Sequence, residues 1–104
     1  MLRLLTIDAM SVDAHGLVHG GFPFGLADHA AMLAVNHPNV VLAKAETRFL
    51  RPVKAGDLLE AEARVTEVIG RKRIVDVTVR QGEHVVLTGI LTCAVLDAHV
   101  LGDG

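Results

Sequence analysis

Residues 22–35, Phe-Pro-Phe-Gly-Leu-Ala-Asp-His-Ala-Ala-Met-Leu-Ala-Val, decide the fold of this chain. Ala, Leu and Met dominate the stretch, and β-branched residues are absent until its last position, so the pattern predicts a helix that starts at Pro23. Pro38 disfavours helix at the preceding residue and ends the segment. Only Asp28 and His29 interrupt the apolar residues, which is typical of a helix enclosed by protein on every side.

The sequence on both sides of this helix has the alternation of β-strands. A short apolar strand is expected first, and the rest of the chain after the helix forms four more. The predicted strands are Leu2–Asp8, Val40–Val53, Leu58–Ile69, Ile74–Arg80 and His84–Leu96. A strand, a long buried helix and four strands in a meander predict a single α+β domain over residues 1–104, in which an antiparallel sheet wraps around one central helix. This is the hotdog fold.

The composition predicts self-association. The chain has 104 residues, of which 51% are hydrophobic, and they include three Phe but neither Trp nor Tyr. A domain of this size exposes much of its surface, and an excess of aliphatic surface is usually covered by another subunit. We therefore expect a homodimer or a higher, dimer-built oligomer such as a tetramer.

Charge and cysteine content exclude several classes of function. The net charge is −2 with both signs spread along the chain, which offers no field for nucleic acid or an anionic membrane. Cys93 is the only cysteine, and we expect it to be a small buried hydrophobe rather than a reactive thiol. His15 and His19 lack a third ligand at a suitable spacing, so neither a metal nor another cofactor is predicted. No apolar segment approaches the roughly 20 residues that span a membrane, and a soluble cytoplasmic protein is expected.

Two features could carry chemistry. His19-Gly20-Gly21 leads into the helix, where glycines allow close approach to the backbone and free N–H groups favour developing negative charge. The alternative is a simple tight turn. Asp28 stands in the middle of the apolar helix, where a buried carboxylate is costly unless it is hydrogen-bonded, and such acids cluster at functional sites. It could instead point to solvent, or bond to His29 or a backbone amide.

The sequence resembles a known enzyme family. The matching residues are His19-Gly20-Gly21, Phe24, Leu26-Ala27-Asp28, Thr47-Arg48-Phe49-Leu50-Arg51-Pro52-Val53, Gly56-Asp57 and Gly70-Arg71. In order and spacing they are similar to the hotdog thioesterases of the phenylacetate-degradation type, and more distantly to hydroxybenzoyl-CoA thioesterases. The resemblance implies hydrolysis of an acyl-CoA or acyl-carrier thioester, with no cofactor other than the coenzyme A of the substrate.

The resemblance also implies roles for single residues. The backbone N–H of Gly20 would polarise the thioester carbonyl, and Asp28 would be the general base or the nucleophile, with the two supplied by different subunits. Asp13 departs from the family pattern, which has Asn or Gln at that position. An ionised Asp13 would repel a developing oxyanion, whereas a protonated one could donate a hydrogen bond. It could also simply cap a turn.

The candidate substrate-binding residues are of two kinds. The basic Arg71, Lys72 and Arg73 at a predicted hairpin suit the phosphates of coenzyme A, and the residues beside the glycine turn and along the helix suit the acyl group. The latter are His19, Gly21, Phe22, Phe24 and Met32. Alternatively, the basic residues are solvated turn residues, and the residues near and along the helix are ordinary core residues.

Two other functions fit the same fold. One is a non-catalytic module that binds acyl-CoA, as in hotdog modules that sense malonyl-CoA, and the presence of Asp13 favours it. The other is an enoyl-thioester hydratase, although the spacing of Asp13 and His19 does not match the motif expected for that activity.

Overall fold

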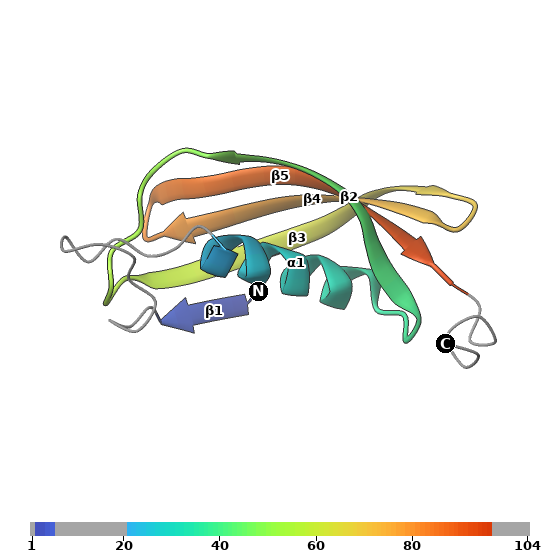
Figure 1. Cartoon of the computed structure of the whole chain (residues 1–104), viewed down its shortest axis with the longest axis horizontal. Coiled ribbons are helices and arrows are strands. Elements are labelled where there is room, and N and C mark those ends of the chain that lie inside the picture. Colours follow the sequence, from blue (N-terminus) through green and yellow to red (C-terminus); the bar gives the residue numbers. More distant parts are fainter. Residues whose placement is uncertain (1, 6–20, 97–104) are drawn as a thin grey trace.

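The computed structural model describes residues 2–5 and 21–96, and in them one helix lies against a five-stranded antiparallel sheet (Figure 1). The elements are β1 (Leu2–Leu5), α1 (Gly21–Val35), β2 (Val40–Phe49), β3 (Leu58–Ile69), β4 (Lys72–Gln81) and β5 (His84–Val95). The sheet curls around α1, which confirms the predicted hotdog fold. No helix in the described ranges is long and apolar enough to cross a membrane.

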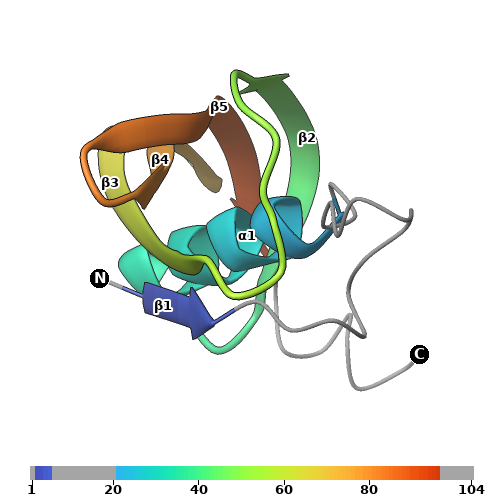
Figure 2. The same cartoon turned by 90° about the vertical axis from the view of Figure 1, so that its left-hand side faces the viewer.

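The strand order is β1-β3-β4-β5-β2, with every neighbouring pair antiparallel. β3, β4 and β5 form the expected meander, but the prediction that β2 belongs to it is wrong, because β2 pairs with β5 at the opposite edge. Residues 50–57 carry the chain from the edge strand β2 to β3, which lies next to the other edge strand β1, and they pass across the start of α1 (Figure 2). Pro52 lacks a backbone donor and Val53 is buried, so the chain leaves the sheet after Phe49 rather than at Val53.

α1 begins two residues before the predicted start and ends where the sequence indicated. Asn36 adopts a left-handed conformation with φ of 53°, and its N–H donates to the carbonyl of Met32 at 3.0 Å. This is the geometry of a helix C-terminus closed by a residue in the left-handed region. Pro38 follows and prevents the helix from continuing.

The core lies between one face of α1 and the inner face of the sheet. The helix contributes Leu26, Ala27, Ala30 and Ala31, and the sheet contributes Leu59, Ala61, Val75, Val77, Val79, Leu87, Leu91 and Cys93. The small helix residues let α1 lie close to the strands.

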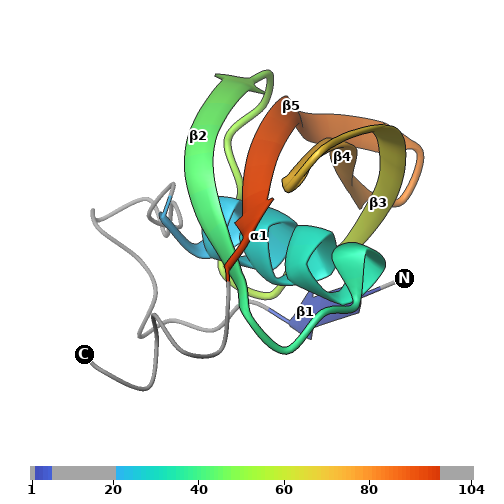
Figure 3. The ribbon, with the colours of Figure 1, turned by 90° about the vertical axis from the view of Figure 1, so that its right-hand side faces the viewer.

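The opposite face of α1 is uncovered in this chain. Phe22 is 40% exposed and Leu33 55%, and His29 is exposed between them. Figure 3 shows β2–β5 curving over α1, with β1 below the helix. One chain therefore leaves part of α1 exposed, and the expectation that a second copy encloses the rest of the helix stays a prediction.

Candidate active site

Asp28 lies on the flank of α1, between the buried and the exposed faces. Phe24, Asp28 and Met32 are spaced by four residues, so their side chains follow one ridge of the helix. All three are half-buried, and Phe24 and Met32 pack against the core. The helix thus places the carboxylate between two of the apolar residues that were predicted to bind an acyl group.

This flank of α1 faces β5. Cys93 of β5 is completely buried, and the pKa of its thiol is raised, mainly by burial and secondly by the nearby Asp28 carboxylate. Cys93 pairs with Leu42 of β2, which is the edge strand next to β5. Asp28 therefore lies near β5, the strand between β4 and the edge strand β2.

One oxygen of Asp28 is buried without a hydrogen bond. Its Oδ1 atom has no hydrogen-bond partner within the described residues, and His29 is exposed on the next ridge. The alternative in which His29 or a backbone amide satisfies this oxygen is therefore not what the structure shows. A buried acceptor without a donor is costly, and one common reason to retain it is that a ligand or water uses it.

The other residues predicted for the site come from the sequence before α1 and from its first turn. Asp13, His19 and Gly20 are outside the described residues, and Gly21 is the first residue of the helix. Phe22 lies in the first turn but on the exposed face, away from the ridge of Asp28. The structure therefore brings Phe24 and Met32, but not Phe22, to the same flank as Asp28.

The basic cluster lies at the hairpin between β3 and β4. In Figure 1 this hairpin is at the opposite end of the molecule from the start of α1. The guanidinium of Arg73 donates from Nη1 to the carbonyls of Gly70 at 2.8 Å and Lys72 at 3.1 Å. Within one chain, Arg71, Lys72 and Arg73 therefore do not meet the helix N-terminus.

The sequence prediction did not connect Cys93 or Leu42 with Asp28. The alternation in β5 places Cys93 on the inner face, but only the pairing with β2 brings Leu42 beside it. Among the residues that the structure describes, no group of three or more His, Cys, Asp or Glu side chains is arranged to hold a metal ion.

Comparison with known proteins identifies the family. The family model of the thioesterase superfamily matches residues 15–88. The chain belongs to this superfamily. The match covers the described elements from α1 through the first part of β5, including the ridge that carries Asp28.

Two curated proteins are similar to parts of the chain. One is a methylthioribose-1-phosphate isomerase of Aquifex aeolicus, 55% identical over 86 residues, which are 83% of this chain and 19% of that protein. The other is the transcription factor FapR of Shouchella clausii, 37% identical over 75 residues, which are 71% of this chain and 39% of that protein. The chain thus matches about a fifth and two fifths of the lengths of these relatives.

Solved structures agree on the fold. An uncharacterized protein of Pyrococcus horikoshii is 62% identical, with a TM-score of 0.92, and the match covers 95% of this chain and 76% of that one. A Streptococcus mutans protein bound to acetyl-CoA is 26% identical, with a TM-score of 0.78 and coverage of 90% and 77%. The PaaI protein of Escherichia coli, from the phenylacetic acid degradation operon, has a TM-score of 0.80, coverage of 90% and 70%, and 24% identity, so it supports the fold alone.

Proposed function

We propose that this chain hydrolyses acyl-CoA thioesters, with Asp28 at the reacting centre. The observation that carries the proposal is the buried, unpartnered Oδ1 of Asp28 on a ridge between Phe24 and Met32. An acceptor oxygen beside apolar side chains can take a proton from water while the acyl group occupies the apolar flank. Membership of the thioesterase superfamily supports this chemistry.

The proposed site takes residues from two copies of the chain, as the resemblance implies. Asp28 lies seven residues after Gly21, which is about 10 Å along the helix at 1.5 Å per residue. This spacing supports an arrangement in which the Gly20 amide and the Asp28 carboxylate of one site come from different subunits of a homodimer.

The proposed reaction follows from these positions. The Gly20 N–H stabilises negative charge on the carbonyl oxygen, while Asp28 removes a proton from the attacking water. The carbon–sulfur bond then breaks, and the proton passes to the departing sulfur, which gives a carboxylic acid and free coenzyme A. If Asp28 is instead the nucleophile, it first forms an anhydride with the acyl group, the carbon–sulfur bond breaks, and the coenzyme A thiolate leaves and takes a proton from water; a second water then hydrolyses the anhydride and frees Asp28. Neither route uses a metal or another cofactor.

Coenzyme A is the proposed carrier, and an acyl carrier protein is the alternative. The Streptococcus mutans protein, 26% identical, is bound to acetyl-CoA, which supports this carrier. Lys72 is exposed at the β3–β4 hairpin and could meet the phosphates of coenzyme A held by a partner.

A second candidate function is binding of acyl-CoA without hydrolysis. The similarity to the transcription factor FapR, 37% identical over 75 residues, favours it, because that name describes a regulator rather than an enzyme. Asp13, which replaces the family's amide side chain, also favours binding without hydrolysis. Binding and hydrolysis are separated by the variants below.

The first experiment measures thiol release from short-chain, long-chain and aromatic acyl-CoAs by wild type and Asp28→Asn. The substitution keeps the shape of the side chain but removes the base, so we expect kcat/KM to fall about 10²–10⁴-fold while acyl-CoA binding remains. Glu83→Gln changes charge equally at an exposed hairpin and should keep wild-type activity. Binding without turnover by wild type would support the binding module instead.

A second arm tests the assignment to two subunits. Gly20→Pro removes the donating N–H and should also be inactive. Co-expression of Gly20→Pro with Asp28→Asn forms mixed dimers, in which one of the two sites receives both intact groups. Recovered activity in purified mixed dimers supports a shared site, whereas mixed dimers as inactive as their parents contradict it.

A further inference from the structure

A hollow of about 440 Å³ lies at the end of α1, where the chain turns from the helix into β2. Its polar lining side chains are those of His29, Asn36 and His37. Its apolar lining side chains are those of Met32, Leu33, Pro38 and Val40. None of these described residues is acidic. The hollow thus combines apolar walls with three side chains that can donate hydrogen bonds to a ligand.

The turn after α1 fixes the ring of His37. Its Nδ1 atom accepts a hydrogen bond from the N–H of Asn39 at 3.1 Å. In the neutral ring the proton is therefore on Nε2, which is left as a donor. Asn39 is in turn tied to the end of the sheet, because its carbonyl accepts a hydrogen bond from the N–H of Leu96 at 2.9 Å. This tautomer suits an acceptor on a ligand rather than a metal ion, which needs a free lone pair on the nitrogen that binds it.

The hollow adjoins the proposed reacting centre. Met32 belongs to its lining and also to the ridge that carries Asp28, one helical turn away. At 1.5 Å per residue, Asn36 stands about 12 Å beyond Asp28 along the helix. An extended chain advances about 3.3–3.6 Å for every three bonds. An acyl chain of about six to eight carbons whose carbonyl lies at Asp28 therefore brings its far end into the hollow, within reach of the polar side chains.

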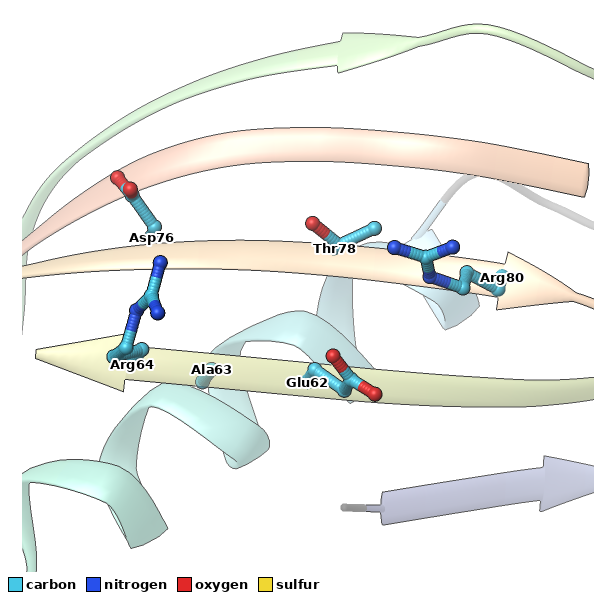
Figure 4. Close-up of a pocket in the computed structure, with 6 residues that line it drawn as sticks. All are labelled: Glu62, Ala63, Arg64, Asp76, Thr78 and Arg80. Atoms are coloured by element: carbon cyan, nitrogen blue, oxygen red, sulfur yellow. The ribbon is translucent and has the colours of Figure 1, made fainter.

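A larger hollow on the sheet does not fit the same role. It measures about 560 Å³ and is lined by residues of β3 and β4 alone, which Figure 4 shows to include Glu62 and Asp76 as well as Arg64. The two acids repel an anionic group, and no residue of α1 contributes to the lining. Only the hollow at the end of α1 shares a residue with the ridge of Asp28 among the hollows described here.

We propose that the hollow at the end of α1 receives the far end of the acyl group and selects acyl groups that end in a carboxylate. The carboxylate accepts hydrogen bonds from Nε2 of His37, from the imidazole of His29 and from the amide of Asn36, while the methylene groups lie along Met32. An alkyl end makes none of these hydrogen bonds. The inference rests on the proposed function, in which the acyl group occupies this flank. The preferred substrates are then coenzyme A monothioesters of dicarboxylic acids with about six to eight carbons.

The test compares kcat/KM for suberyl-CoA and octanoyl-CoA, which have the same chain length and differ only at the far end. We expect wild type to prefer suberyl-CoA about 10-fold, because hydrogen bonds to a charged group are stronger than neutral ones. His37→Asn keeps an acceptor oxygen in place of Nδ1 but lacks Nε2, so the preference should fall at least about threefold. His29→Glu places a carboxylate beside the substrate's own and should reverse the preference.

A matched control and the contrary outcomes make the test decisive. His84→Asn changes an exposed histidine at the start of β5 and should leave the wild-type preference unchanged. Equal turnover of both esters by wild type would overturn the proposal. So would histidine variants that lose activity equally on both, because the hollow would then hold a part that the two esters share. If wild type hydrolyses neither ester, the proposed function fails, and calorimetric titration of the same esters decides. Tighter binding of suberyl-CoA that His29→Glu weakens would support the hollow's role, whereas equal affinities would overturn it.

Discussion

Replacement of Gly89 by Ala tests how closely β2 and β5 approach each other. Gly89 pairs with Thr47 of β2 and Val77 of β4. A Cβ atom at position 89 would lie 2.8 Å from Cγ2 of Thr47, 3.0 Å from the carbonyl oxygen of Glu46 and 3.4 Å from Cγ2 of Val77. The first distance is shorter than real carbon contacts, and the second involves backbone, so the strands must shift to admit a methyl group.

The expected loss of stability follows from two opposing effects. Insertion of one carbon into a filled site costs about 1–3 kcal/mol. Ala also reduces the freedom of the unfolded chain, which returns about 0.4–1 kcal/mol. We therefore expect Gly89→Ala to lower the free energy of unfolding by about 1–2 kcal/mol, which corresponds to a Tm lower by about 5–10 °C for a domain of this size.

Urea unfolding at matched protein concentrations measures this difference, because self-association makes stability depend on concentration. Thr47→Ser removes the methyl group nearest to the added carbon and should relieve part of the cost in the double variant. The rest of the cost in stability should remain, because the added carbon still lies close to the Glu46 carbonyl oxygen, which belongs to the backbone. A Gly89→Ala protein as stable as wild type, or a double variant with no favourable coupling, would refute the close approach of these strands.

The remaining predictions concern Cys93 and Val53. The pKa of Cys93 is raised in the folded state, so above about pH 8.5 the thiol loses its proton first in the unfolded chain, and the free energy of unfolding falls as pH rises. Cys93→Ala should remove this contribution to the fall in the free energy of unfolding between about pH 7 and 10. A slope unchanged in Cys93→Ala would contradict this. Val53→Ala should destabilise the chain by about 1–3 kcal/mol in urea, because it leaves a cavity under the crossing connection, whereas Val68→Ala, on an exposed side chain, should change stability little.

The helix and most strand limits could be predicted because local patterns determine them. The Ala- and Leu-rich stretch before Asn36 has no alternative to helix, and the alternation in β3 fixes which of its residues face inward. The place of β2 could not be predicted in this way. Its partner depends on how residues 50–57 cross the sheet, and neither propensity nor alternation contains that information.

The residues of the candidate site were likewise predictable where a local pattern reveals them, and not where they depend on distant strands. Asp28 is conspicuous in the sequence, because a carboxylate in an apolar helix needs a reason, and its buried oxygen agrees with that argument. Cys93 comes near it, with Leu42 as the strand partner of Cys93, only through the packing of distant elements. The distance between the helix start and Asp28 also required the structure, since the sequence gives a spacing in residues but no length until the helix is established.

A second copy on the α1 side accounts for three independent features of the structure. β2 is an edge strand whose outer N–H and C=O groups have no strand partner in the described sheet, and natural proteins rarely leave such an edge uncovered. Phe22 and Leu33 are exposed on the uncovered face of α1 beside it. Asp28 lies near Cys93 of β5, the strand next to this edge, and about 10 Å from the start of its own helix. A partner that paired with β2 would cover the apolar face, and under the shared site proposed above the same contact would supply the second subunit's part of the active site.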